Sequence, residues 1–346
     1  MTKEEIIRKR LSNQYLQSPV STERVVKDLC GIQAQFFGNV IHSLKLRSNE
    51  SWGKGDGLVK NWTLRGTMHV FSEADLPLFL RCGDKYRRNE WAAKSFWNQR
   101  SDWALTPERQ KALSDVILQA VTEKDRSREE LKQRCREFGM TEAEEASMFH
   151  PWGGGIRELC ERGFLHYAAR EEKVFCLSPV VEPVALEKAE LELARRYFTN
   201  FAPATIHDAM CFFKVPASQI KKWLAQLPVT AAVWDGKTYY SIENGKTPER
   251  EIPECLFLAG FDQLMLGYEK KESLYLKPEN LRDIYNLAGI VTPALLINSE
   301  VVGKWKEKDG CLTVTPFRGL SAREMSAMKD NAEHLWPQLR KLKIEA

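Results

Sequence analysis

Two glutamines beside an aromatic pair are the first residues in this chain whose types and spacing suggest chemistry. The stretch GIQAQFFGNV (31–40) holds Gln33 and Gln35 with one alanine between them, and glycines lie on either side. Side-chain amides are neutral groups that both donate and accept hydrogen bonds. Two amides that point to the same place could orient a small ligand such as a water molecule.

The preceding run STERVVKDLC (21–30) has the apolar spacing of an amphipathic helix, which we expect over residues 22–32. Val25, Leu29, Ile32 and Phe36 would form one buried stripe. In a continuing helix the two glutamines would lie ~200° apart, because each residue turns the helix ~100°. They can face one ligand only if the helix stops and the chain extends, since residues i and i+2 of an extended chain share a face. The alternative is a pair of surface glutamines that cap a helix end.

A second constellation is WTLRGTMHVF (62–71), which has the alternation of a strand. One face would be apolar, and Arg65, Thr67 and His69 would share the other face with Thr63. Arginine offers a fork of donors that suits phosphate, and histidine can donate or accept a hydrogen bond. The strand therefore predicts a polar site or, alternatively, an exposed face with a solvated arginine.

Two further stretches are candidates. HPWGGGIRELC (150–160) places Trp152, Gly153 and Gly154 at a helix start, where free N–H groups can hold an anion. The alternative is a tight turn in which glycine relieves packing. Asp262, in AGFDQLMLGY (259–268), is a carboxylate in front of an apolar stretch and is more simply explained as a turn residue.

Several classes of protein are excluded. The chain has no phosphate-binding loop, no dinucleotide fingerprint, no zinc-protease motif and no serine-nucleophile elbow. None of its eight cysteines forms a C-x-x-C pair, so we expect neither a metal site nor a cofactor. No signal peptide and no apolar run of ~20 residues is present, which predicts a cytoplasmic protein without a membrane span. The net charge of +4 is compatible with nucleic-acid binding.

The pattern of expected elements recurs along the chain as two helices followed by a short two-stranded segment. This is the outline of a winged helix. The expected helices lie at residues 4–11, 22–32, 106–121, 127–138, 152–163, 190–201, 203–213 and 216–227. Hairpins are expected at 164–177 and at 229–242, where Asp235-Gly236 is a strong turn signal. We predict winged-helix units over 1–104, 105–188 and 189–245.

The remaining segment, 246–346, is expected to form a small C-terminal β element closed by a helix. Residues 243–260 resemble a linker. The stretches 255–268, 293–308 and 310–317 have the composition of strands, with Asn298-Ser299 as a turn, and 321–336 has the periodicity of an amphipathic helix. The predicted fold class is α+β and helix-rich.

The motifs, taken together, resemble one family. The residues Gln33-Ala34-Gln35, W-x-x-R-G-T-x-H (62–69), Trp152-Gly153-Gly154, F-D-x-L-x-x-G-Y (261–268) and PALLINSEVVGKW (293–305) occur in the order typical of the winged-helix DNA glycosylases of the AlkZ/YcaQ type. The resemblance covers nearly the whole chain. It implies tandem winged helices arranged as a C-shaped clamp. One departure is that Tyr268 is followed by Glu269-Lys270-Lys271, where the family often has Asp-Arg.

The resemblance also implies the function and the site. Gln33 and Gln35 would be catalytic in a monofunctional DNA glycosylase that excises N7-alkylated purines and unhooks interstrand crosslinks. DNA-binding or site-lining roles would fall to Arg65, Thr67, His69, Trp152, Gly153, Gly154, Asp262 and Tyr268. The partner would be double-stranded DNA containing alkylated purines, bound by a monomer that associates with the nucleoid.

The neutral glutamines are consistent with that chemistry. An N7-alkylpurine is already a cation, so it leaves without protonation, and the enzyme need only hold a water near C1′ and tolerate an oxocarbenium-like state. No lysine lies beside the motif, so lyase chemistry through a Schiff base is not expected. Two other hypotheses stay open: a non-catalytic winged-helix DNA-binding or regulatory protein, and a scaffold for a protein partner.

Overall fold

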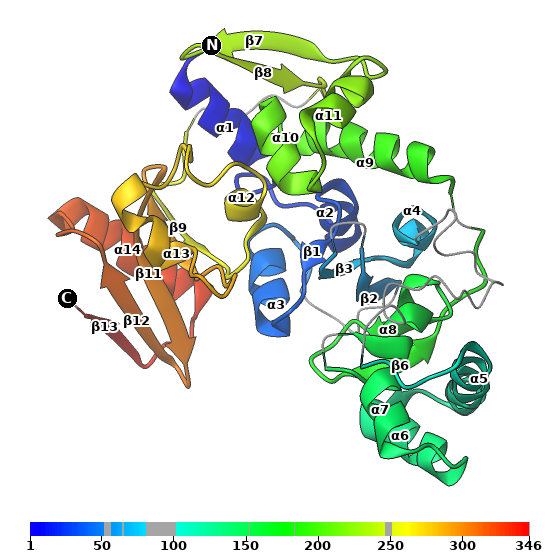
Figure 1. Cartoon of the computed structure of the whole chain (residues 1–346). Helices are drawn as coiled ribbons and strands as arrows, with labels where there is room; N and C mark the ends of the chain where they lie inside the picture. The colour runs from blue at the N-terminus through cyan, green and yellow to red at the C-terminus, as the bar shows by residue number, and fades with distance from the viewer. Residues whose placement is uncertain are drawn as a thin grey trace. The chain divides into compact units, whose positions relative to one another are not determined.

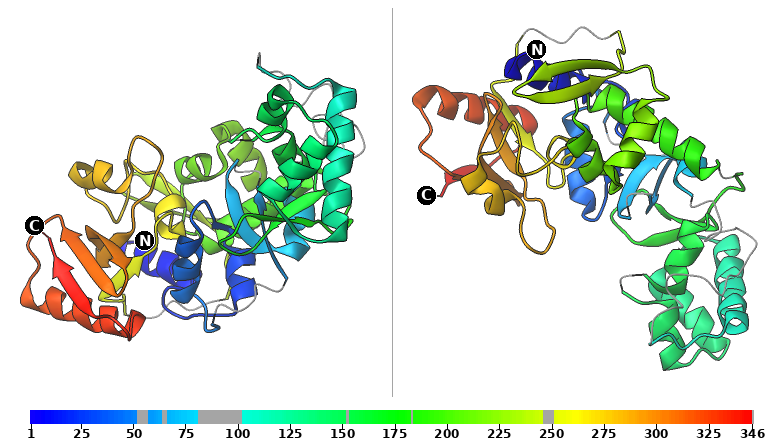
Figure 2. Two further views of the ribbon diagram at one scale, coloured as in Figure 1. Left: turned by 90° about the horizontal axis from the view of Figure 1, so that it is seen from below. Right: turned by 45° about the horizontal axis from the view of Figure 1, so that its top comes forward.

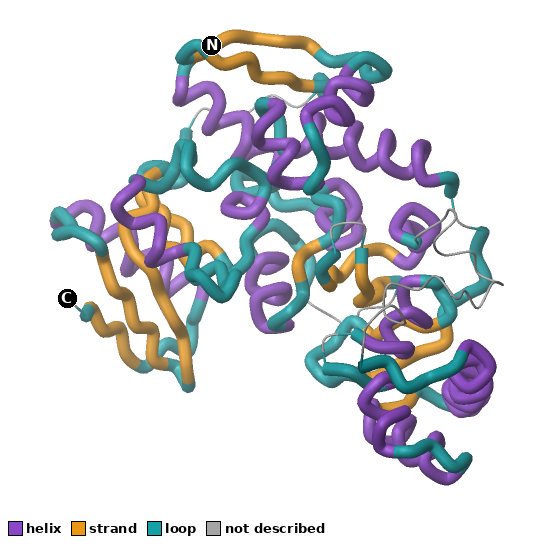
Figure 3. The backbone as a smooth tube through the Cα atoms, viewed as in Figure 1, coloured by secondary structure: helices purple, strands orange, loops and turns teal. Residues whose placement is uncertain are grey.

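The computed structural model describes residues 1–51, 57–63, 66–80, 102–151, 153–182, 184–245 and 251–345. The chain divides into two compact units. Unit 1 joins the two ends of the chain, Met1–Trp52 and Ala194–Ala346, and unit 2 is Gly53–Leu193. Each unit combines helices with short, mainly antiparallel strands (Figures 1 and 3). The α+β, helix-rich class is therefore confirmed, while the finer division at residues 104, 188 and 245 stays a prediction.

The first 52 residues of unit 1 form three helices around one short extended segment. These are α1 (Lys3–Asn13), α2 (Thr22–Asp28), β1 (Ile32–Gln33) and α3 (Phe37–Lys45). Helix α1 begins with a capping box, in which the side chains of Thr2 and Glu5 satisfy free N–H groups of the first turn. Helix α2 is shorter than predicted, because it ends at Asp28 and not at residue 32.

Helix α9 (Leu186–Asn200) starts in unit 2 and ends in unit 1, where it is followed by two helices and a hairpin. These are α10 (Ile206–Phe213), α11 (Ala217–Leu224), β7 (Thr230–Trp234) and β8 (Lys237–Ser241). The predicted order of elements and the Asp235-Gly236 turn are confirmed, since Trp234 pairs with Lys237 across it. Figure 2 shows the hairpin beside α1.

The rest of unit 1 is a five-stranded sheet with the order β13-β12-β11-β10-β9. Its elements are β9 (Cys255–Leu258), α12 (Gln263–Leu266), a 3-10 turn (Pro278–Asn280), α13 (Leu281–Ile284), β10 (Ala294–Ile297), β11 (Glu300–Lys308), β12 (Cys311–Pro316), α14 (Ala322–Leu335) and β13 (Lys341–Ile344). Helix α14 packs on this sheet through Met328, Ala332 and Leu335.

Two predictions for this region are wrong. Residues 255–268 are not one strand, because only Cys255–Leu258 pairs with β10 and the chain then turns into α12. The same strand lies inside the predicted linker 243–260, although all four of its residues are buried. The terminal strand β13, which runs parallel to β12, was not predicted.

Unit 2 contains a sheet in which the order of its own strands is β3-β2-β5-β6-β4. Its elements are β2 (Leu58–Trp62), β3 (Met68–Ser72), a 3-10 turn (Glu73–Asp75), α4 (Leu76–Phe79), α5 (Pro107–Glu123), β4 (Arg126–Ser127), α6 (Arg128–Glu137), α7 (Glu142–Met148), α8 (Gly154–Glu161), β5 (Leu165–Ala168) and β6 (Val174–Leu177). The predicted hairpin over 164–177 is confirmed.

The single strand predicted over 62–71 is wrong. The chain reverses there, so that Trp62 pairs with Met68 and Asn61 pairs with His69 in an antiparallel hairpin. The N–H of Thr63 donates to the carbonyl of Thr67 and closes the turn. The alternation of apolar and polar residues continues through this turn. A prediction based on a period of two residues therefore does not detect the turn.

Within the described ranges, no helix is both long and apolar enough to cross a membrane. The same ranges contain no group of three or more acidic, histidine or cysteine residues that could hold a metal ion. The cysteines in the described part of the chain are free thiols, most of them buried.

Helix α3 is attached to the C-terminal sheet through His42. The imidazole lies 4.8 Å from the ring of Trp305 and 5.5 Å from that of Trp336, measured between centroids. Its Nε2 is 2.6 Å from the carbonyl oxygen of Phe257, to which it donates. Burial lowers the pKa of His42 to about 4, which keeps the ring neutral in the folded protein.

This half-buried histidine predicts a loss of stability in acid. The unfolded chain binds a proton at His42 near pH 6.5, whereas the folded chain does so only near pH 4, so the free energy of unfolding falls as the pH drops between these values. We expect the substitution His42→Gln to reduce the slope of the free energy of unfolding against pH by the equivalent of one bound proton. Urea denaturation at several pH values measures the slope. His166→Gln should have a similar effect, because burial also lowers the pKa of His166 to about 4, and an unchanged slope in both variants would contradict the prediction.

Candidate active site

The glutamine segment begins where α2 ends. Cys30 and Gly31 both adopt left-handed backbone conformations, with φ of 57° and 83°. The N–H of Gly31 donates to the carbonyl of Val26 at 2.7 Å, which completes the last turn of the helix. Glycine suits the second of these positions because it has no side chain to clash. The chain leaves the helix in an extended conformation at Ile32–Gln33.

The two glutamine side chains meet directly. Gln33 Nε2 donates to Gln35 Oε1 at 2.9 Å. Gln33 is 7% exposed, whereas Gln35 is exposed to solvent. This bond uses one end of each amide, and each amide has a second end that can bond a third group. The interpretation that the helix stops and the amides converge is therefore confirmed, although their catalytic role stays a prediction.

Asp262 is held in a buried ion pair at the start of α12. Its two carboxylate oxygens accept from Arg47 at 2.7 and 2.9 Å, and both side chains are 0% exposed. One oxygen also accepts from the N–H of Leu264, which caps α12, and Arg47 donates to Ser43 Oγ at 3.0 Å. Asp262 is therefore a structural residue that ties the loop after β9 to the end of α3, and it has no surface with which to contact DNA.

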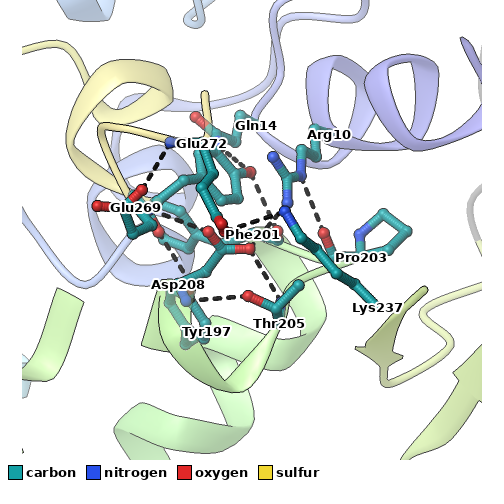
Figure 4. Close-up of polar contacts among 12 residues, drawn as sticks. Arg10, Gln14, Tyr197, Phe201, Pro203, Thr205, Asp208, Lys237, Glu269 and Glu272 are labelled. Atoms are coloured by element: carbon teal, nitrogen blue, oxygen red, sulfur yellow. Dashed lines mark hydrogen bonds and ion pairs between the residues drawn. The ribbon is translucent and has the colours of Figure 1, made fainter. Parts of the chain in front are cut away.

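Tyr268 is also buried, and it bonds Gln14 and Phe201, two residues that are labelled in the polar network of Figure 4. Its hydroxyl donates to the carbonyl of Phe201 at 3.0 Å and accepts from Gln14 Nε2 at 2.8 Å. The Arg10 guanidinium lies 3.6 Å from the centre of its ring. Burial raises the pKa of Tyr268 well above its usual value, so the phenol stays neutral and supports the fold.

Arg10 and Asp208 are the charged pair of this network. They are 3.1 Å apart, and Arg10 also donates to the carbonyl of Pro203. Asp208 accepts the N–H groups of Thr205 and Glu269 at 2.9 Å each. At the edge of the network, Lys237 pairs with Glu272 at 3.0 Å (Figure 4). The Arg10–Asp208 pair was not predicted from the sequence, although Thr205-x-x-Asp208 is a recognisable capping box.

The candidates in unit 2 form two separate groups. His69 is fully buried, and its Nδ1 lies 3.0 Å from the carbonyl oxygen of Thr67 and 3.2 Å from Thr63 Oγ1. The chain therefore brings Thr67 and His69 together at one hairpin. Arg65 lies outside the described residues.

The glycines at the start of α8 are closely packed. Gly153 donates its N–H to the carbonyl of His150 at 3.0 Å. Gly154 has φ of 76°, and a Cβ added there would lie 2.4 Å from the carbonyl oxygen of Ser147. Both glycines are buried. The geometry matches the packing alternative and not an exposed anion site, and Trp152 lies outside the described residues.

Comparison with known proteins agrees with the order of the motifs. The chain matches the AlkZ-like family model, described as DNA glycosylase AlkZ-like, over residues 26–336. The interstrand DNA cross-link repair glycosylase of Streptomyces sahachiroi is 26% identical over 358 residues, covering 94% of this chain and 93% of the relative. The solved structure of Streptomyces sahachiroi DNA glycosylase AlkZ superimposes with a TM-score of 0.78 at 21% identity, covering 100% of this chain and 99% of that one.

The fold is thus that of a DNA glycosylase of known structure. Because the family model spans most of its length, the chain belongs to the AlkZ-like family of DNA glycosylases, enzymes that hydrolyse N-glycosyl bonds in DNA. The resemblance deduced from the motifs is confirmed. The hypotheses of a non-catalytic regulator and of a scaffold are set aside.

The Arg47–Asp262 pair predicts a large effect on stability. Asp262→Asn leaves the guanidinium buried opposite a neutral group, and we expect the free energy of unfolding to fall by about 3–5 kcal/mol. The double variant Arg47→Met, Asp262→Leu removes both charges and should be less destabilised than Asp262→Asn. Chemical denaturation of the variants measures the difference. Equal stability of Asp262→Asn and the wild type would contradict the assignment.

Proposed function

We propose that this enzyme releases N7-alkylated purines from double-stranded DNA, including the ends of interstrand crosslinks, by attack of a water molecule that Gln33 and Gln35 position. The observation that supports this most directly is the 2.9 Å bond between the two amides, which brings two neutral polar groups to one point beside solvent. The name of the Streptomyces sahachiroi relative supports the inclusion of crosslinks.

The reaction requires little proton transfer. As the C1′–N9 bond breaks, its electron pair moves to N9 and neutralises the cationic base. The water oxygen forms the new bond to C1′ and then loses a proton to solvent. A general acid is unnecessary because the leaving group is already positively charged, and a weak base suffices for so labile a bond.

The two glutamines would have different tasks. Gln33 is buried, and its amide nitrogen donates to Gln35 Oε1, so it orients that oxygen. Gln35 is exposed and can therefore contact the water itself. A correctly oriented amide oxygen accepts a hydrogen bond from the water, and the negative end of its dipole favours the positive charge that develops on the sugar.

The substrate would be bound mainly through its backbone. The other end of a crosslinked base is anchored in the opposite strand, so that base cannot be flipped into a deep pocket in the ordinary way. An exposed Gln35 suits a base attacked close to the duplex. We propose that a monomer binds the DNA through phosphate contacts, to which Arg65, Thr67 and Trp152 remain candidate contributors, in the cytoplasm at the nucleoid.

Removal of either amide should abolish most of the activity. We expect Gln35→Ala and Gln33→Ala each to reduce the single-turnover rate of N7-methylguanine release by about 100-fold or more, as for the loss of one positioned polar group in other enzymes. Gln133→Ala is a matched control, because Gln133 is an exposed glutamine on α6 that bonds only its own helix at Glu137. Rates close to the wild type in both site variants would overturn the proposal.

The neutral pair also predicts the dependence on pH and on lesion charge. Amides do not titrate, so the rate of N7-methylguanine release should be constant between about pH 6 and pH 8.5. A duplex with the uncharged lesion 8-oxoguanine should show no release above the spontaneous rate. A rate that follows a single ionisation in this range would instead indicate a titrating catalytic group.

A further inference from the structure

An exposed aromatic ring directly follows Gln35. Phe36 is 53% exposed, although an apolar ring of this size usually gains from burial. One side of it stacks on Phe261, with 5.9 Å between ring centroids and 26° between ring planes. Phe261 itself is buried. We call the two rings the Phe36–Phe261 stack, in which Phe36 presents an aromatic surface to solvent next to Gln35 in the chain.

Both residues of this stack occupy backbone positions that are locally unfavourable for them. Phe36 occupies the N-cap position of α3 and makes no side-chain cap hydrogen bond, where Ser, Thr, Asp or Asn would stabilise the helix. Phe261 has φ of 57°, a left-handed conformation that is unfavourable for a bulky residue. The next residue, Asp262, is locked by the buried pair with Arg47. Locally unfavourable conformations that the surrounding structure holds in place are typical of functional sites.

The position of the stack suits the leaving base. Consecutive Cα atoms are about 3.8 Å apart, so the backbone of Phe36 lies within the width of one nucleoside from the backbone of Gln35. In the proposed reaction Gln35 serves the water that attacks C1′, the atom to which the base is bonded. The face of an aromatic ring is electronegative and attracts cations as well as flat π systems. An N7-alkylpurine is both.

We propose that the Phe36–Phe261 stack receives the alkylated purine and recognises its positive charge through the π face of Phe36. This inference rests on the proposed function and names its specificity determinant. The base loses its charge as the C1′–N9 bond breaks, so the attraction is strongest for the substrate and weakens toward the product. The stack should therefore strengthen binding of the lesion and should slow the chemical step slightly, because the transition state retains only part of the charge.

Fluorinated phenylalanines at position 36 test this directly. Replacement of Phe36 by 4-fluoro-, 3,5-difluoro- and 3,4,5-trifluorophenylalanine withdraws electron density from the ring face in steps and nearly preserves its size. The probe is a duplex that contains N7-methylguanine on a 2′-fluoroarabinose sugar, because this fluorine disfavours the oxocarbenium state and prevents cleavage. The reference is the same duplex with unmethylated guanine on the same sugar.

We expect Kd for the methylated duplex to rise in steps along the series, by about 2- to 30-fold in total, the range of a single cation–π contact. Kd for the reference duplex should stay constant. The same fluorination of Phe138, an exposed ring that ends α6, is the matched control and should change neither value. Single-turnover rates at saturating N7-methylguanine DNA should not fall along the series.

Three results would overturn the stack as the recognition surface: no trend along the series, an equal loss for both duplexes, or a loss confined to the single-turnover rate. Failure of the proposed function gives a different result, in which the wild type releases no base from cleavable N7-methylguanine DNA. If the enzyme releases the base normally and the series shows no trend, only the inference about the stack fails.

Discussion

The buried ion pair between Arg47 and Asp262 is the interaction on which the site in unit 1 depends. Neither side chain has any exposed surface, and the two groups come from the end of α3 and the start of α12. A charge in such a place is tolerated only because its partner satisfies it with two short hydrogen bonds. The pair thereby fixes the loop that contains Phe261 against the helix that follows Gln35.

Other contacts of the same kind join the two ends of the chain within unit 1. His42 packs a neutral ring against Trp305 and Trp336, and Tyr268 bonds both Gln14 and the carbonyl of Phe201. Each of these contacts places a polar group against aromatic rings and satisfies it with a specific partner, which makes its geometry well defined. A pair of amides that positions a water molecule would need such support, because Gln33 and Gln35 lie on a short non-helical segment.

The absence of charge at Gln33 and Gln35 agrees with the proposed chemistry. A cationic base needs no acid, and a carboxylate beside the water would gain little for a bond that is already labile. Selectivity must then come from recognition of the cation, and the exposed ring of Phe36 lies beside the residue that would guide the water. In this view the glutamines supply orientation and the Phe36–Phe261 stack supplies discrimination.

Local signals in the sequence were sufficient for most of the elements. The pattern of apolar residues predicted α5, α6, α10 and α14, and Asp235-Gly236 predicted the hairpin of β7 and β8. The ordered motifs were sufficient for the family. The spacing of Gln33 and Gln35 also imposed a condition that the structure meets, namely that the amides can cooperate only if the helix ends before them.

Some features could be decided only by the tertiary structure, mainly because they depend on residues that are far apart in the sequence. The end of α2 at Asp28 requires two left-handed residues, and the apolar stripe continued past them as if the helix went on. The hairpin at 62–71 and the strand β13 depend on pairing with other strands. Asp262 had the local pattern of a turn residue because its partner, Arg47, lies 215 positions away. The sequence alone determined the family and the two neutral amides, whereas burial and long-range pairing decided which other polar residues support the fold and which remain exposed for a substrate.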